Sequence, residues 1–500
     1  MYELFLGVWE TAKDILIRPG RSLKEFRLLT SRTNAENVMS KVSLKSRLCC
    51  LPKTADHIYL NIPFISAAMQ AVSCPKLAVA LAQFGGLSVL PCSLPAKDVV
   101  MMVEEVKRYK AGFQENVVTL TKDQLISEAV QVMNSKGYHK FPITDDGLPH
   151  GKLIGMLSDR NFDPKDHAQD KIAKHMVKRV VAGKEGITLD EANKVMIKYG
   201  VTILPIVDKK NHLLYCVFKK DFQKHREFPL GSVDEKHRYM VAAAVSTQPS
   251  DRQRIDALIK EETDLIVVDS SDGFSDFQVE TLNYIKKRSP RTPVVGGNII
   301  TYDGFMHLAN AGFDAVKVGM GIGSGCTTQE QKGTGRGQAT ALIDVVKARN
   351  EFFASAGKYI PVIADGSISN PGQLVIALAL GADSIMMGRF FAQFTESAGE
   401  VRNHPTYGPL KEFWMEASAR AHSFGRYDQS ASTWFEEGVE GYVPHTGSIY
   451  DNLGKTLLKI RSALSNAGCK SVDELHEKAV VELQSFSSLQ DAGVHDIIMK

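Results

Sequence analysis

The feature that most constrains the fold of this chain is a regular alternation of short apolar runs with segments of helical periodicity. Eight runs read as strands, at residues 62–66, 86–90, 239–245, 264–269, 293–297, 315–319, 360–364 and 383–387. Helical patterns between them include residues 75–84, 252–262, 277–288, 338–354 and 371–380. Because the runs are apolar without strict alternation, they suit strands buried on both faces of a parallel sheet. Eight strand–helix units predict an α/β fold, a (β/α)8 TIM barrel. An open doubly wound sheet has the same local signature and is the alternative.

An interval at about residues 113–226 breaks this rhythm and contains an internal repeat. Five residues recur 63 positions further along, as Glu128/Glu191, Ala129/Ala192, Met133/Met196, Gly137/Gly200 and Pro142/Pro205. Each copy predicts a helix, a short strand, a turn and a second strand, and the pair resembles a tandem of CBS motifs (about 113–170 and 174–226), a Bateman module inserted between barrel segments 1–112 and 227–500. Repeats of this kind complete their cores against each other. The resemblance implies a sensor of adenine or guanine nucleotides; a packing domain that binds nothing is the alternative.

Composition excludes several classes of protein. Hydrophobic residues make up 44% of the 500 residues and charged residues 23%, which is typical of a soluble globular protein. The net charge of +3 argues against a dedicated nucleic-acid or polybasic membrane binder. Seven cysteines without a C-x-x-C pair argue against a disulfide framework or a zinc ribbon. With neither a signal-peptide pattern nor a membrane-length apolar run, we expect a soluble cytoplasmic protein.

The loops that follow the predicted strands carry the residues expected to do chemistry, as the carboxyl ends of barrel strands usually do. The most unusual is a glycine-rich loop at residues 319–328 that contains Cys326. Lone cysteines are usually inert and buried, and Cys74, Cys92 and Cys216 lie in apolar runs that fit this. Cys326 lies instead among Gly, Ser and Thr. A free thiol is only a few per cent thiolate at neutral pH, so a site that uses this cysteine must stabilise the anion.

Several motifs combine into a family resemblance that spans nearly the whole chain and is strongest over residues 264–345. They are Gly321-x-Gly-Ser-x-Cys326-x-Thr328, Asp269-Ser270-Ser271, Asp365-Gly366, Arg426-Tyr427 and the inserted CBS pair. Together they resemble the IMP dehydrogenase / GMP reductase family, and within it the inosine-5′-monophosphate dehydrogenases. The resemblance implies that Cys326 adds to C2 of the purine of inosine 5′-monophosphate (IMP), that hydride leaves for NAD, and that water releases xanthosine 5′-monophosphate, in guanine nucleotide synthesis.

The resemblance also implies residue roles. Catalysis would involve Cys326, Thr328, Arg426, Tyr427 and Glu437. Substrate contacts would come from Ser66, Met69, Ser324, Asp365, Gly366, Ser367, Gly388, Arg389, Phe413, Glu416, Ala417 and Glu437. NAD contacts would come from Asp269, Ser270, Ser271, Asn298, Gly319, Met320 and Gly321. A monovalent cation, K⁺, would bind carbonyls of Gly321, Gly323 and Cys326, completed by a neighbouring subunit's tail near Asp491, Ala492 and Gly493. That arrangement implies a homotetramer.

Two routes to the water-activating base stay open. Arg426-Tyr427 lies in a polar stretch that reads as a mobile flap, at about residues 400–445, and the family assigns this Arg to water activation. A neutral Arg at pH 7 costs roughly 7 kcal/mol, at about 1.36 kcal/mol per pKa unit. A relay through Thr328 and Glu437 is the cheaper route because a carboxylate is already a base.

The sequence also departs from the family pattern. Gly325 stands where Ile or Val usually precedes the cysteine, and Ser367 replaces a second Gly. The family's Tyr-x-Gly-x-Gly-Ser segment corresponds to residues 413–418, which read Phe-Trp-Met-Glu-Ala-Ser. Met415 and Ala417 replace its two glycines and are expected to crowd the base pocket. These departures keep GMP reductase, which deaminates GMP with NADPH, as an alternative, and a catalytically inactive nucleotide-sensing regulator as another. The Arg426-Tyr427 pair favours the dehydrogenase.

Overall fold

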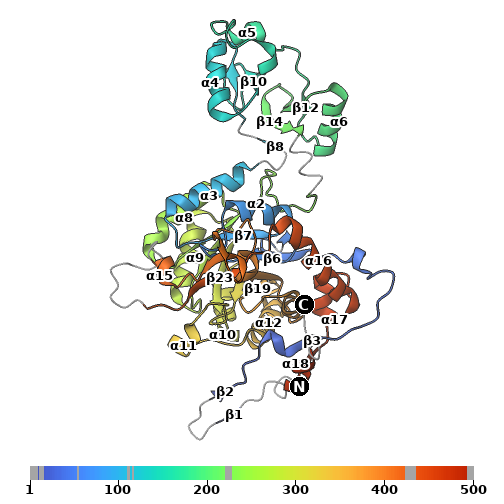
Figure 1. Ribbon diagram of the computed structural model, residues 1–500, viewed down its shortest axis with the longest axis vertical. Coiled ribbons are helices and arrows are strands. Elements are labelled where there is room, and N and C mark those ends of the chain that lie inside the picture. The colour runs from blue at the N-terminus through green and yellow to red at the C-terminus, as the bar shows by residue number, and fades with distance from the viewer. Residues whose placement is uncertain are drawn as a thin grey trace. The chain divides into compact units, whose positions relative to one another are not determined.

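Eight parallel strands close into a barrel in the larger of the two units into which the chain divides (Figure 1). The computed structural model describes residues 9–10, 16–52, 54, 56–109, 113–114, 117–219, 228–422 and 435–492. The barrel unit comprises Met1–Lys107, Leu230–Ser232 and Met240–Lys500, and the second unit, here called the repeat unit, comprises Arg108–Pro229 and Val233–Tyr239.

The order of the barrel strands follows the sequence, with the first two strands joining the last. The order is β15 (Ala242–Val245), β16 (Leu265–Asp269), β17 (Val294–Ile299), β18 (Ala315–Val318), β19 (Val362–Asp365), β20 (Ser384–Met387), β6 (Phe64–Ser66) and β7 (Leu87–Leu90). The ring closes because β7 pairs in parallel with β15, Val89 opposite Ala242. The predicted (β/α)8 barrel is therefore confirmed, and the open doubly wound alternative is wrong.

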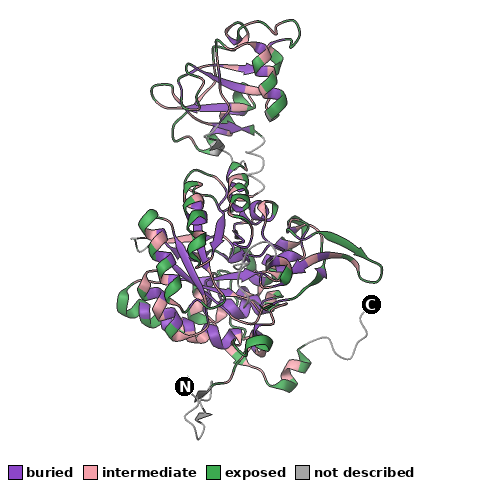
Figure 2. Ribbon diagram, turned by 90° about the vertical axis from the view of Figure 1, so that its left-hand side faces the viewer, coloured by how far each residue is buried: buried purple, intermediate pink, exposed green. Residues whose placement is uncertain are grey.

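Helices surround the strands, which are buried on both faces while the helices expose their outer faces (Figure 2). They are α2 (Pro75–Gln83), α3 (Ala96–Arg108), α8 (Arg252–Lys260), α9 (Asp276–Arg288), α10 (Tyr302–Ala311), α12 (Gln338–Ala356), α13 (Pro371–Ala379) and α16 (Ile449–Asn466). The start of α13 shows how the sequence sets such boundaries. Pro371 occupies the first turn, and the Asn370 side chain accepts a hydrogen bond from Gln373 N at 3.0 Å.

Shorter elements complete the barrel unit. Sheet pairs are β1 (Trp9–Glu10) with β2 (Leu16–Ile17), β3 (Phe26–Leu28) with β24 (Val481–Leu483), and β4 (Ser46–Cys50) with β5 (His57–Leu60). A separate sheet has the order β21 (Val401–His404), β22 (Gly408–Trp414) and β23 (Glu440–Pro444). Short helices are η1 (Leu23–Glu25), η2 (Met39–Lys41), η4 (Pro249–Asp251), α11 (Thr328–Lys332), α14 (Arg389–Ala392), α15 (Ala419–His422), α17 (Val472–Lys478) and α18 (Phe486–Asp491). The three-stranded sheet lies within the segment expected to form a flap.

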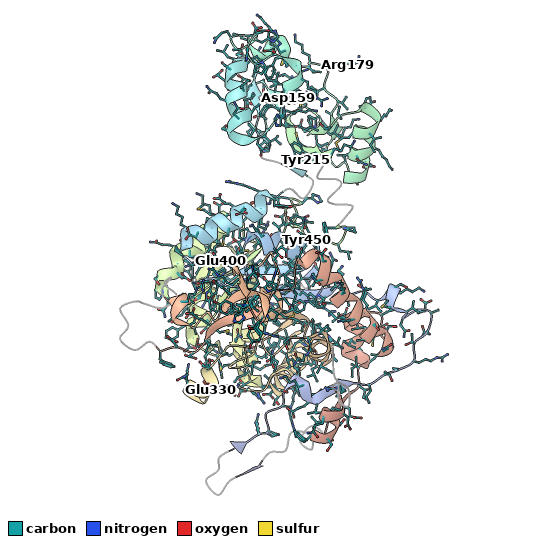
Figure 3. The ribbon with its side chains drawn as sticks, in the orientation of Figure 1. Asp159, Arg179, Tyr215, Glu330, Glu400 and Tyr450 are labelled. Carbon is teal, nitrogen blue, oxygen red and sulfur yellow. The ribbon has the colours of Figure 1, made fainter. Side chains whose placement is uncertain are left out.

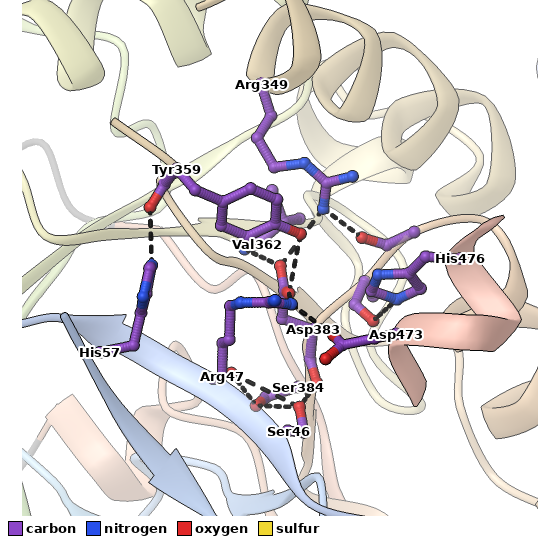
Figure 4. Close-up of polar contacts among 12 residues, drawn as sticks. Ser46, Arg47, His57, Arg349, Tyr359, Val362, Asp383, Ser384, Asp473 and His476 are labelled. Atoms are coloured by element: carbon purple, nitrogen blue, oxygen red, sulfur yellow. Dashed lines mark hydrogen bonds and ion pairs between the residues drawn. The ribbon is translucent and has the colours of Figure 1, made fainter. Parts of the chain in front are cut away.

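A buried carboxylate, Asp383, gathers charged groups where β20 begins (Figure 4). It accepts hydrogen bonds from Val362 N and Tyr359 Oη, both at 2.9 Å, and from Arg349 Nη1 at 3.3 Å. The guanidiniums of Arg47 and Arg349 lie 4.8 and 4.7 Å from the centre of the Tyr359 ring. Burial, together with Asp383, raises the pKa of Tyr359. This cluster ties β4, α12 and the segments before β19 and β20 together at the amino end of the barrel.

The repeat unit contains two copies of one motif, each with its own apolar core. The first copy has β9 (Leu120–Thr121), α4 (Ile126–Lys136), β10 (Lys140–Thr144), β11 (Leu153–Ser158), η3 (Asp159–Asn161) and α5 (Ile172–His175). The second has β12 (Gly183–Lys184), α6 (Leu189–Tyr199), β13 (Ile203–Val207) and β14 (Leu213–Phe218), with β8 (Phe113–Gln114) added beside β14. Both copies break register near the end of their first long strand, between Ile143 and Thr144 and between Ile206 and Val207.

The two copies are joined by reciprocal backbone hydrogen bonds. Leu153 N donates to Asn211 O at 2.9 Å, and Leu213 N donates to Gly151 O at 3.0 Å. Asp159, the first residue of η3, and Tyr215, on β14, mark the two copies in Figure 3. The 63-residue repeat of the sequence is thus also a repeat of structure. Among the described residues, no helix combines the length and the apolar character that crossing a membrane would need.

Candidate active site

A cavity at the carboxyl ends of the barrel strands brings together most of the residues singled out in the sequence. Those that line it are Met69, Asp269, Ser270, Ser271, Asn298, Gly319, Met320, Gly321, Gly323, Ser324, Cys326, Thr328, Asp365, Gly366, Ser367, Gly388, Arg389, Phe413, Glu416, Ala417 and Glu437. The strand order explains this, since the loops after parallel barrel strands meet at one end. Residues separated by more than 350 positions therefore share one wall, as Met69 and Glu437 do.

The remaining predicted residues lie elsewhere or outside the described chain. Ser66 is buried, and its Oγ lies 2.7 Å from Ser73 Oγ, so it supports the loop after β6 without lining the cavity. Asp491 ends α18, and Ala492 lines a second cavity formed with β3, α13 and α16. Arg426, Tyr427 and Gly493 lie outside the described residues.

Cys326 is held in a short turn beside the start of α11. Its Sγ lies 3.1 Å from Thr328 Oγ1, and its backbone N donates to Gly323 O at 3.1 Å. Cys326 is partly exposed in the cavity, whereas Thr328 is buried. Because a hydroxyl can donate a hydrogen bond to a thiolate, Thr328 is placed to stabilise the nucleophilic form. Glu437 is anchored at this turn, where its O accepts from Thr327 N at 2.9 Å and its Oε1 lies 3.3 Å from Lys332 Nζ.

Lys317 is the main charged residue that sequence reasoning missed. Its ammonium lies on β18, 2% exposed, at 2.9 Å from Asp269 Oδ1 and 3.0 Å from Asp365 Oδ2. It also donates to Asn298 Oδ1, while Asn298 Nδ2 donates to Asp365 Oδ2 at 3.1 Å. Burial alone would lower the pKa of Lys317, but the two carboxylates raise it above its ordinary value. Lys317 therefore joins the carboxylate expected to contact NAD to the one expected to contact the substrate.

Other lining residues missed in the sequence are apolar or small. They are Ala67, Ala68, Ile322, Ile368, Met386 and Met387. Nothing in an apolar residue at a strand end separates a pocket wall from ordinary core, so no sequence signal identified them. Lys317 did carry a signal, because a lone lysine interrupts the otherwise apolar run of residues 315–318. Such a residue is buried only when it is paired.

The altered segment at 413–418 forms another wall of the cavity. Phe413 and Glu416 are buried, and Glu416 Oε1 accepts a hydrogen bond from Gln70 N at 2.5 Å. Trp414 Nε1 donates to Gln70 Oε1 at 3.1 Å. Ser367, which stands where the family usually has the second glycine of the Asp365 turn, adopts φ 60°, in the left-handed region that favours glycine. The cavity thus keeps its polar groups although several glycines are replaced.

The residues present fit both a dinucleotide and a monovalent cation. A dinucleotide would meet the hydroxyls of Ser270 and Ser271 and the amide of Asn298, which line the cavity. Gly319 has φ 141°, and a Cβ there would overlap Asp365 O, so only glycine fits where the end of β18 packs against the end of β19. Of the carbonyls expected to bind K⁺, Gly321 O accepts from Gln329 Nε2 at 2.8 Å and Gly323 O accepts from Cys326 N. A carbonyl oxygen has two lone pairs, so each keeps capacity for a cation. Among the described residues, no group of three or more His, Cys, Asp or Glu side chains could hold a metal ion.

Comparisons with known proteins show what the whole chain is similar to. The IMP dehydrogenase / GMP reductase domain family matches residues 20–495. The chain is 38% identical over 491 residues to inosine-5′-monophosphate dehydrogenase of Tritrichomonas foetus, covering 96% of this chain and 97% of that protein. It is 36% identical to that of Aquifex aeolicus, covering 88% and 89%. Its structure is similar, at TM-score 0.82 and 26% identity, to a cysteine-to-alanine variant of GMP reductase from Trypanosoma brucei in complex with guanosine 5′-monophosphate, covering 96% of this chain and 99% of that one.

Proposed function

Since the chain belongs to the IMP dehydrogenase / GMP reductase family, we propose that it catalyses the NAD-dependent oxidation of IMP to xanthosine 5′-monophosphate, a step of guanine nucleotide synthesis. The observation that carries this proposal is the placement of the Cys326 sulfur. It lies 3.1 Å from a buried hydroxyl, in the cavity that also contains the Asp269–Lys317–Asp365 cluster. A nucleophile beside paired nucleotide-binding carboxylates suits covalent chemistry on a ribonucleotide.

In the first half of the reaction, the Cys326 thiolate adds to C2 of the purine, and the π bond between C2 and N3 opens with its electron pair moving to N3; the bond re-forms when hydride leaves C2. Asp365 binds the ribose hydroxyls, and Ser324, Gly366, Ser367, Gly388 and Arg389 hold mainly the phosphate. NAD, when bound, supplies the hydride acceptor, and Asp269, Ser270, Ser271, Asn298 and residues 319–321 hold it. Loss of hydride from C2 leaves a thioimidate, in which the carbon is oxidised and still bonded to sulfur.

In the second half, water attacks the thioimidate carbon and the thiol leaves. Thr328 and Glu437 line the cavity and form one candidate relay for the proton of that water. Glu437 Oε1 also lies 3.3 Å from Lys332 Nζ, so this carboxylate is held beside a cation at the edge of the cavity. Arg426 and Tyr427 are the other candidates.

We also propose that K⁺ binds the carbonyls of Gly321, Gly323 and Cys326 in a homotetramer. Within one chain, Ala492 lines a different cavity from the one lined by Gly321, Gly323 and Cys326. We therefore propose that the tail residues near these carbonyls come from a neighbouring subunit. Replacing K⁺ with tetramethylammonium is expected to lower turnover at least tenfold. Turnover that does not depend on the cation would contradict this part of the proposal.

For the repeat unit we propose a pair of CBS motifs that bind an adenine or guanine nucleotide. The reciprocal hydrogen bonds between its two copies support a paired arrangement of the motifs. Asp159, the first residue of η3, is a candidate for ribose hydroxyls. Calorimetric titration of the full chain with ATP or GTP, and of Asp159→Ala as the weakened variant, tests this assignment.

The activity is tested with purified protein and both substrate pairs. IMP and NAD are expected to give a rise in NADH absorbance, and mass spectrometry is expected to find a nucleotide adduct on Cys326. A fall in absorbance with GMP and NADPH would instead assign the chain to GMP reductase. This alternative is kept because the chain is similar in fold to the Trypanosoma brucei reductase. Binding of nucleotides without turnover of either pair would favour a regulator.

A further inference from the structure

Met415 lies against three glycines on the two segments that flank it. A Cβ added to Gly325 would lie 3.0 Å from Met415 Cγ and 3.2 Å from its Sδ. A Cβ on Gly323 would lie 3.2 Å from Met415 Cε, and one on Gly438 would overlap Met415 Cβ. These separations are tighter than ordinary van der Waals contact. The methionine side chain therefore fills, from its base to its tip, the space that side chains at these positions would take.

Backbone hydrogen bonds join the same three segments into a ladder. Gly325 O accepts from Val439 N at 3.0 Å, and Val439 O accepts from Met415 N at 3.2 Å. At its other end, Glu437 links Thr327 N to Ala417 O, at 2.9 and 3.0 Å. The Cys326 turn thus rests on residues 437–439, and these rest on residues 415–417, from which Met415 reaches back to Gly325.

The backbone of Gly325 does not itself demand glycine. Gly325 is absent from the described glycines with positive φ, so a larger residue there needs only space. Met415 makes the two nearest contacts in that space, and Val439 Cγ2 lies 3.3 Å from the same added Cβ. The two departures from the family pattern, a lost side chain before the cysteine and a gained one at 415, are therefore reciprocal in the structure.

We propose that Met415 is a positioning residue that holds the Cys326 turn in place of a side chain at position 325. A glycine next to the nucleophile frees the backbone on both sides of Gly325. The Met415 thioether packs on that turn and restricts it, which keeps the sulfur beside Thr328 Oγ1. The inference rests on the proposed covalent role of Cys326, and it predicts that side chains at 325 and 415 substitute for each other.

A double-mutant cycle tests this substitution. The variants are Met415→Gly, Gly325→Ile and the double variant, with Met415→Leu as the variant that keeps the side-chain volume. The rate of the first burst of NADH formation is expected to fall at least tenfold in Met415→Gly, with the KM for IMP changed less than about threefold. Gly325→Ile is expected to be slowed as well, because its side chain collides with Met415. The double variant is expected to recover to within about threefold of the wild type, and Met415→Leu to keep at least a third of the burst rate.

A second readout separates this inference from the proposed function. The rate of Cys326 alkylation by iodoacetamide at pH 7, without nucleotides, is expected to fall in both single variants and to recover in the double variant. Cys326 is followed by peptide mass spectrometry; burial raises the pKa values of Cys49, Cys50, Cys74, Cys216 and Cys469, and the remaining cysteine, Cys92, is buried. If the wild type does not oxidise IMP, the proposed function fails while the alkylation cycle still decides the role of Met415.

Two results would overturn the inference. One is a Met415→Gly variant within twofold of the wild type in both rates. The other is a double variant whose loss equals the product of the two single losses. Melting temperatures are measured for all variants, and Met415→Ala replaces Met415→Gly in the cycle if the glycine variant does not fold.

Discussion

A single buried ammonium connects the two halves of the active-site cavity. Lys317 contacts Asp269 and Asp365, each 48 residues away along the chain in opposite directions. The strands that carry these residues, β16, β18 and β19, place the groups at one end of the barrel. Without the ammonium, two carboxylates would face the same cavity with no cation between them, and like charges repel. The cation offsets that repulsion and holds both carboxylates in place.

Lys317→Met removes that charge while keeping much of the side-chain volume. We expect kcat/KM for IMP to fall at least 100-fold, or about 2.7 kcal/mol at about 1.36 kcal/mol per tenfold change. The KM values for both IMP and NAD are expected to rise, because one cation serves both carboxylates. Lys317→Arg, which keeps the charge, is the matched control and is expected to lose less. Steady-state kinetics with each substrate varied would refute this role if Met and Arg variants behaved alike.

Ser367 carries a local backbone cost. With φ 60°, it holds a conformation that costs a non-glycine residue roughly 1–2 kcal/mol. Ser367→Gly is therefore expected to raise the melting temperature by about 1–2 °C, a smaller shift than in a small domain because the chain is long. Ser367→Ala keeps the backbone cost and removes only the hydroxyl, so it is not expected to be stabilised. Equal melting temperatures for the Gly and Ala variants, measured by calorimetry, would show that the backbone is unstrained.

At the scale of elements, the barrel strands could be predicted because strands buried on both faces are short, almost entirely apolar runs in the sequence. Residues 294–299 show what a local pattern does not predict. The strand was expected to stop at Gly297, but β17 continues to Ile299 through a register shift against β18. Lys317 was missed for a related reason. Its partners come from two other strands, and only the assembled order of strands β16 to β19 brings them within 3.0 Å. Met415 was expected to crowd the base pocket, and its contacts with Gly323 and Gly325 depend on strand-end loops that no local pattern specifies.

The helix α17 gives the barrel a pH-sensitive support. His476 donates from Nε2 to Ala382 O at 3.0 Å, next to Asp383 (Figure 4). Desolvation is the largest cause that lowers the pKa of His476; Arg349 adds to it, and Asp383 and Asp473 oppose it. Protonation therefore favours the unfolded state. The stability that this histidine contributes is complete above its ordinary pKa of about 6.5 and is lost as the pH falls below that value.

His476→Gln keeps a donor for Ala382 O and removes the titration. The melting temperature of the wild type is expected to fall between about pH 7 and pH 5, and that of the variant to fall less. The free energies of unfolding of the two proteins are expected to diverge by at most about 1.36 kcal/mol per pH unit. His57→Gln is the matched control, because His57 also bonds a backbone carbonyl, Tyr359 O at 3.0 Å, in the same cluster. If the pH profile is unchanged in His476→Gln but flattened in His57→Gln, the pH sensitivity belongs to His57 and the prediction for His476 is wrong.

At the scale of the whole molecule, the described residues that line the active-site cavity all belong to the barrel unit. The repeat unit has separate cores, one around Phe141 and Leu157 and one around Leu204 and Val217. The internal repeat marked this region in the sequence, because each copy runs helix, strand, turn and strand and so departs from the strand–helix alternation of the barrel. We therefore expect chemistry in the barrel unit and any response to nucleotides in the repeat unit.

Replacing residues 108–229 with a short Gly/Ser linker should therefore separate the two properties. We expect the shortened chain to oxidise IMP with a kcat within about threefold of the full chain, because every described cavity residue is retained. We expect ATP or GTP to change the rate of the full chain and to leave that of the shortened chain unchanged, since a ligand shifts an equilibrium only where it binds. Asp159→Ala in the full chain is the control that keeps the unit but weakens its proposed ligand contact. A shortened chain that still responds to nucleotides would place the effector site in the barrel, and a full chain that does not respond would leave the repeat unit as packing alone.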